Sequence, residues 1–169
     1  MRRPPLGVVF VAILVLALGE TAGAVMSQLR PQTERWARAR VAARAPAHGL
    51  TGSLEYDTEV VDRAVFTAEA GLSFLHTHAQ GLPVIVVLAA SVVATLVSGR
   101  RLRGALYALL GVGALFPLGY LVYGLAVLEL GRDAGLTLAE RWVLTPLGTA
   151  TILALVTLAL ALARAPSPR

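Results

Sequence analysis

The sequence predicts an all-α polytopic membrane protein, a four-helix transmembrane bundle with an extra-membrane amphipathic helical segment between the first and second spans. Of the 169 residues, 56% are hydrophobic and only 15% are charged, whereas soluble domains carry about 25% charged residues. The mean hydropathy is +0.70. Four apolar stretches are long enough to cross a bilayer, which takes about 20 residues. Because little sequence is left over, we expect residues 1–169 to form a single integral membrane domain.

The first predicted span covers about residues 6–28, behind the basic pair Arg2 and Arg3. The same stretch has features of a secretory signal peptide, because a short apolar core precedes the small-x-small pattern Ala22-Gly23-Ala24. Apolar residues resume at once after this pattern. We therefore favour an uncleaved anchor over a signal peptide that is removed after Ala24.

A polar segment, about residues 30–80, follows the first span. Pro31 opens an arginine-rich stretch, which predicts a short basic helix over residues 31–41. A proline and two glycines then predict a loop over residues 46–52. From Glu59 onward, apolar side chains recur every three or four residues beside a mostly polar stripe, the pattern of an amphipathic helix.

The second predicted span covers about residues 82–98 and begins at Gly81-Leu82-Pro83. A proline inside a helix removes one backbone donor and clashes with the preceding turn, so we expect a kink or a break there. A break would lay residues 59–80 along the membrane surface, whereas a kink would leave them standing above it as an extension of the span.

The third predicted span covers about residues 104–130, with Pro117 near its middle. Small residues let transmembrane backbones approach closely, and we expect this role for its glycines, Gly111, Gly113, Gly119 and Gly124. The fourth span covers about residues 138–163. Thr137-Leu138-Ala139-Glu140 has the spacing of a capping box, so we expect the fourth helix to start at Leu138.

Arginines near the predicted spans indicate the orientation. If four helices cross, seven of these arginines fall on one side, which should be cytoplasmic: Arg2, Arg3, Arg100, Arg101, Arg103, Arg164 and Arg169. Both termini are then cytoplasmic, and residues 29–80 lie on the outer side.

The composition also bears on partners and chemistry. All fifteen basic residues are arginines, and the pI is near 10.7. These arginines are scattered around apolar spans without a stacking platform, so we expect no nucleic-acid binding. The expected partners are the lipid bilayer and either other membrane subunits or further copies of this chain. The absence of cysteine excludes thiolate ligands, and no motif of a common soluble enzyme is present.

The most informative local feature is the stretch Glu69 to Gln80, because ionisable residues at a membrane are costly and often mark function. His76 and His78 are the candidate cofactor ligands. If the helix opened at Gly81 and Pro83, both histidines could surround copper or another divalent metal together with His48 and either Glu69 or Glu20. The competing interpretation is that the histidines are ordinary polar residues at the membrane interface.

On an intact helix, His76 and His78 are separated by roughly 200° of rotation, so each could face a separate haem. This arrangement is similar to the His-x-His pair in the catalytic subunit of the haem–copper oxygen reductases, and the likeness covers His76-Thr77-His78. A second axial ligand would have to come from His48, Met26 or another subunit.

Two functions follow from these observations. In the first, the protein is a small membrane subunit whose outer-face histidines bind haem or a metal ion in a redox-associated complex. In the second, it is a cofactor-free structural or interaction subunit that docks a partner or lipid headgroups through residues 30–80, where the arginines matter more than the histidines. A transporter is less favoured, because Glu20 is the main acidic residue within a span and no inverted repeat is evident.

Overall fold

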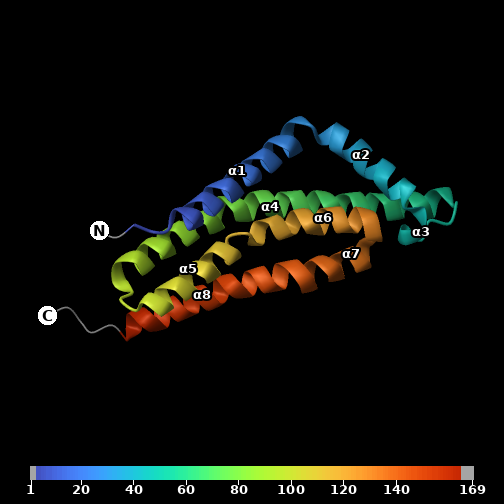
Figure 1. Ribbon diagram of the computed structural model, residues 1–169. Helices are drawn as coiled ribbons and strands as arrows, with labels where there is room; N and C mark the ends of the chain where they lie inside the picture. Colours follow the sequence, from blue (N-terminus) through green and yellow to red (C-terminus); the bar gives the residue numbers. More distant parts are fainter. Residues whose placement is uncertain (1–2, 165–169) are drawn as a thin grey trace.

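The computed structural model describes residues 3–164, and every regular element in this range is helical. Four helical stretches are long and apolar enough to cross a membrane: Leu6–Gln28, Leu54–Leu96, Arg100–Leu130 and Arg132–Ala163. They pack side by side, and the first begins and the last ends at the same end of the bundle (Figure 1). The predicted all-helical architecture with four long apolar helices is therefore confirmed. Arg2 and Arg169, which entered the orientation argument, lie outside the described residues.

Helix α1 (Leu6–Gln28) packs along helix α4 (Leu54–Leu96). Small side chains line this contact, with Val15 and Ala22 of α1 packed in one buried cluster with Leu75 and Ala79 of α4. A Cβ atom added at Gly19 would overlap the side chain of Ala79. The two backbones therefore approach closely, as small residues permit in transmembrane helices.

Helix α4 continues without interruption through Pro83. It is 43 residues long, which corresponds to about 65 Å at 1.5 Å per residue. The break considered at Pro83 is therefore absent. Residues 59–80 and the apolar residues that follow them instead belong to one continuous helix.

Helix α2 (Arg30–Ala43) confirms the predicted basic helix, with Pro31 in its first turn. Only Leu29 separates it from α1, and the chain turns there so that α2 descends toward the N-terminal end of α4 (Figure 1). The short helix α3 (Ala45–His48) and a loop follow. Ala37 and Val41 of α2 pack in a buried cluster with residues of α4 and with Val127.

The third apolar stretch is not one continuous α-helix. It consists of α5 (Arg100–Gly113), a 3₁₀ turn, η1 (Phe116–Leu118), and α6 (Gly119–Leu130). The predicted span over residues 104–130 is thus helical along its length but departs from α-helical geometry at its middle. The reason is Pro117, which has no N–H to donate and excludes the carbonyl of the preceding turn.

The fourth helix starts earlier than predicted, at Arg132 rather than Leu138. Gly131 has a φ of 82° and reverses the chain between α6 and α7 (Arg132–Ala139) in one residue. Thr137 is inside α7, where its hydroxyl donates to the carbonyl oxygen of Asp133 at 2.8 Å, so it does not cap a helix. A π-helical segment, η2 (Glu140–Leu144), then leads into α8 (Thr145–Ala163), whose end agrees with the prediction.

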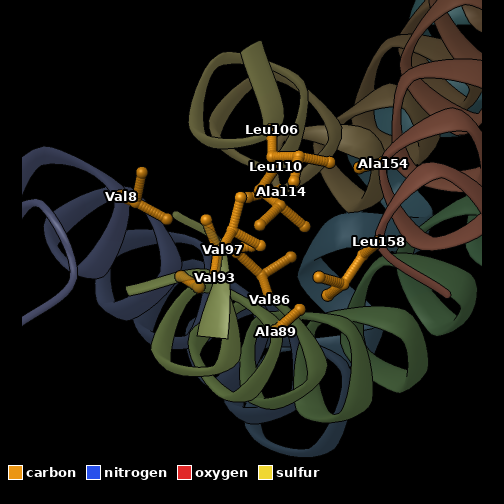
Figure 2. Close-up of a cluster of buried hydrophobic side chains, with 11 residues drawn as sticks. Val8, Val86, Ala89, Val93, Val97, Leu106, Leu110, Ala114, Ala154 and Leu158 are labelled. Carbon is orange, nitrogen blue, oxygen red and sulfur yellow. The ribbon is translucent and has the colours of Figure 1, made fainter. Parts of the chain in front are cut away.

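The largest buried apolar cluster joins α1, α4, α5 and α8 (Figure 2). It is built mainly of valine, leucine and alanine, with Val86, Val93 and Leu106 fully buried. Close packing of these side chains supplies dispersion contacts between the four helices.

Three of the four glycines expected to mediate close packing do so. A Cβ atom at Gly124 would lie 3.1 Å from the carbonyl oxygen of Ala68. A Cβ atom at Gly113 would overlap Thr151, and one at Gly119 would overlap the side chain of Leu144. Gly111 has only an ordinary contact at 3.8 Å, to Val8.

Candidate functional site

His76 and His78 lie near the middle of α4 and contact different helices. Because the helix is continuous, the roughly 200° between them is kept. His76 contacts α1, whereas His78 contacts rings from η1 and α6. The two imidazoles therefore belong to two separate environments and do not form one ligand set.

The side chain of His76 in α4 forms a hydrogen bond to α1. Its Nδ1 atom lies 3.0 Å from the carbonyl oxygen of Gly19, and since a carbonyl can only accept, Nδ1 carries the proton. Its Nε2 atom lies 3.1 Å from Nε2 of Gln80, whose amide also donates to Glu20 Oε1 at 3.3 Å. The ring occupies space left by Gly23, where an added Cβ atom would lie 2.7 Å from the ring atoms. Nδ1 of His76 thus bonds directly to α1, and Nε2 contacts Gln80 of its own helix, which in turn reaches Glu20 of α1.

His78 sits in an aromatic cluster. The centroid of its ring lies 4.8 Å from that of Tyr120 and 5.6 Å from that of Phe116. Its Nδ1 atom donates to the carbonyl oxygen of Phe74 at 2.9 Å. In the neutral imidazole this leaves Nε2 as a hydrogen-bond acceptor.

An apolar groove of about 410 Å³ lies beside His78 and is called the His78 groove below. It lies between α4, η1 and α8. Its lining includes Thr77, His78, Gly81, Phe116, Gly148 and Thr151.

The other two predicted metal ligands lie elsewhere. His48 is in α3, where its Nε2 atom donates to the carbonyl oxygen of Leu128 at 3.1 Å. Glu69 faces the start of α2, with Oε2 3.6 Å from the guanidinium of Arg30. Within residues 3–164, no three histidine, aspartate or glutamate side chains are grouped so that they could hold a metal ion. The four residues are therefore not brought together.

The arginines of α2 form a second polar constellation. Arg40 and Arg44 both pair with Glu129 near the end of α6, the latter at 2.9 Å. Arg38 pairs with Glu34 at 3.0 Å and with Asp62 of α4 at 2.7 Å. These hydrogen bonds to Asp62 and Glu34 raise the pKa of the Arg38 guanidinium. The pairs with Asp62 and Glu129 join α2 to α4 and α6.

We call this part of the molecule the polar extension. It comprises α2, α3, residues 54–75 of α4, and residues 124–139 of α6 and α7. Sequence reasoning identified the basic helix but missed Glu129 as the partner of its arginines. An acidic residue at the end of an apolar stretch was the available signal, but nothing local pairs it with arginines 85 and 89 residues away.

Comparison with known proteins gives no family model, curated protein or solved structure that matches this chain.

Proposed function

We propose that the protein is an integral membrane subunit that works by interaction. Its four long apolar helices cross the membrane, with both termini cytoplasmic, and the polar extension on the outer side docks another membrane subunit or a second copy of this chain. Membrane insertion is supported by the large apolar side chains on the outside of the bundle, such as Phe10, Leu88 and Ile152, which are 66%, 65% and 63% exposed. Contiguous apolar surface of this kind is disfavoured in water.

The docking function is supported chiefly by the ion pairs that the arginines of the polar extension form within the chain. A polybasic segment that binds lipid headgroups needs its charges free, but Arg38, Arg40 and Arg44 are paired with acids from α2, α4 and α6. The pairs fix α2 against the other helices. The polar extension therefore has a defined shape, which favours recognition of a protein surface over a lipid surface.

Exposed aromatic residues on the polar extension supply the contact chemistry. Trp36, Tyr56 and Phe66 are 52%, 49% and 72% exposed. Aromatic side chains are enriched among the residues that dominate binding energy at protein interfaces. A rigid base with exposed aromatic residues is the arrangement that a docking subunit needs.

Site-specific photo-crosslinking in the native membrane tests this function. A benzoylphenylalanine placed at Phe66 or Trp36 should give a discrete crosslinked protein band, whereas the same group at Phe10, on the apolar part of α1, should not. The band should disappear when exposed aromatic residues of the extension are replaced by serine. Lipid adducts alone at all three positions would rule out docking through the extension.

A second function, haem or metal binding in a redox-associated complex, is favoured by one observation. The Nδ1 atom of His78 is held by a backbone carbonyl, the way in which many metal-bound histidines are oriented. His78 would be one axial ligand, and a partner subunit would supply the other. A reduced-minus-oxidised optical spectrum with elemental analysis tests this, and a cofactor signal that His78→Ala removes would support it.

A further inference from the structure

We propose that the His78 groove binds a lipid-soluble aromatic alcohol of the quinol class, with the Nε2 atom of His78 accepting a hydrogen bond from a ring hydroxyl. The inference rests on the membrane location proposed above and is independent of docking by the polar extension. Three features of the groove support it: its free hydrogen-bond acceptors, its aromatic surroundings and the irregular backbone beside it.

The polar side chains that line the groove have already used their donors. Each donates to a backbone carbonyl one turn earlier in its own helix: His78 to Phe74 at 2.9 Å, Thr77 to Ser73 at 2.9 Å, and Thr151 to Leu147 at 3.4 Å. Only acceptor positions remain for a ligand. A ligand that itself brings only acceptors would leave polar atoms unpaired in an apolar site, which is costly. The groove therefore favours a hydroxyl donor, a quinol rather than the corresponding quinone.

The surroundings favour a ring over an acyl chain. Phe116 lines the groove, and the rings of Phe116, Tyr120 and His78 are neighbours with centroids 4.8 to 5.6 Å apart. Aromatic rings gain from offset or edge contacts with another ring beyond simple burial. Gly81 and Gly148 keep the groove open because they have no side chains. An aromatic alcohol with an apolar tail matches this combination of ring contacts, acceptors and apolar walls.

Two of the long helices depart from α-helical geometry, one of them at a residue that lines the groove, Phe116. One has the 3₁₀ turn Phe116–Leu118, and the other has the π-helical segment Glu140–Leu144, and these meet where Gly119 faces Leu144. Irregular backbone at membrane depth is tolerated where it is buried or lines a cavity, and π-helical turns often occur at functional sites. The 3₁₀ turn, which contributes Phe116 to the groove, therefore supports a ligand site here.

The same imidazole would serve the haem alternative, and the groove distinguishes the two ligands. A haem with two axial ligands needs a second donor, and among the described residues that line the groove there is no second histidine and no methionine. A quinol needs one strong acceptor, which His78 supplies. This chain alone therefore supplies the acceptor that a quinol needs.

The test measures binding of tritiated decylbenzoquinol, kept reduced, to the full chain in mild detergent. We expect saturable binding, with the dimethyl ether of the same compound binding about tenfold more weakly because one hydrogen bond is lost. His78→Phe should weaken quinol binding about tenfold and abolish the preference for quinol over ether.

A pair of glycine substitutions supplies the matched control. Gly81 lines the groove and a Cβ atom there meets nothing within 4 Å, so the side chain of Gly81→Leu should occupy the groove and abolish binding. Gly104 also has nothing within 4 Å and lies outside the groove, so Gly104→Leu should bind like the unmodified protein.

Three results would overturn the proposal: no saturable binding, equal affinity for quinol and ether, or unchanged binding by Gly81→Leu. A haem absorbance band that His78→Phe removes would assign the imidazole to haem instead. Because Gly81→Leu keeps the imidazole, it tests the groove even if His78→Phe does not fold. The docking function fails separately, by loss of the crosslinks at Phe66 and Trp36.

Discussion

The imidazole of His76 in α4 donates a hydrogen bond from Nδ1 to the carbonyl oxygen of Gly19 in α1, across 3.0 Å. One helical turn further along α1, Gly23 leaves the space that the ring occupies. Ala22 and Gly23, two residues of the stretch Ala22-Gly23-Ala24 that resembles a cleavage pattern, thus have a packing role in the folded protein.

Gly23→Val should separate α1 from α4. The added Cβ atom would lie 2.7 Å from the imidazole of His76, and overpacking of this kind costs about 1–3 kcal/mol. We expect a lower thermal unfolding temperature in detergent. Gly7→Val is the matched control, because a Cβ atom there meets nothing within 4 Å. Adding His76→Ala to Gly23→Val should recover part of the loss, and an unchanged unfolding temperature for Gly23→Val would contradict the contact.

Helix α1 should remain in the mature protein. Its buried residues Val8, Val15 and Ala22 pack within the bundle, and Leu29 alone links it to α2. Intact-mass spectrometry of the protein purified from its native membrane should therefore give a mass that includes residues 6–28. A mass that lacks residues 1–24 would show that the signal-peptide interpretation was right.

Glu129→Gln should loosen the contact between α2 and α6 within the polar extension. Glu129 accepts hydrogen bonds from both Arg40 and Arg44, and because these side chains are partly exposed, each pair alone contributes little to stability. Cleavage by trypsin after Arg40 and Arg44 should become several-fold faster. Salt should accelerate cleavage of the unmodified protein more than that of the variant.

Glu140→Gln is the control for this experiment, because it also removes one exposed acidic charge but lies in η2. It should leave the rate of cleavage by trypsin unchanged. Equal acceleration by both variants would mean that net charge, and not the pairing with Glu129, protects α2.

Local patterns predicted the helices well and their interruptions poorly. Apolar length fixed α1 to within a residue, and Pro31 marked the start of α2, because both depend on neighbours in the sequence. Pro83 and Pro117 look alike in sequence, yet α4 passes through the first and the third stretch breaks at the second. The outcome depends on how neighbouring helices compensate for the lost hydrogen bond, which is a tertiary property.

The candidate site shows the same limit. The spacing of His76 and His78 predicted correctly that an intact helix points them apart, because helical geometry alone decides it. Their partners, Gly19 for His76 and the rings of Phe116 and Tyr120 for His78, come from helices distant in sequence. The register between helices sets these contacts, and no local pattern contains it.

The proposed orientation can be measured directly, because the chain has no cysteine and a single introduced cysteine is labelled at one site. Ser53 and Ser98 flank the two ends of α4, and both are exposed. With the polar extension on the outer side, a membrane-impermeant maleimide should label Ser53→Cys in intact cells and label Ser98→Cys only after permeabilisation. The positive-inside bias of Arg100, Arg101 and Arg103 beside Ser98 is the physical reason for this difference. The reverse labelling pattern would place the polar extension in the cytoplasm, and labelling of both sites in intact cells would show that α4 does not cross the membrane.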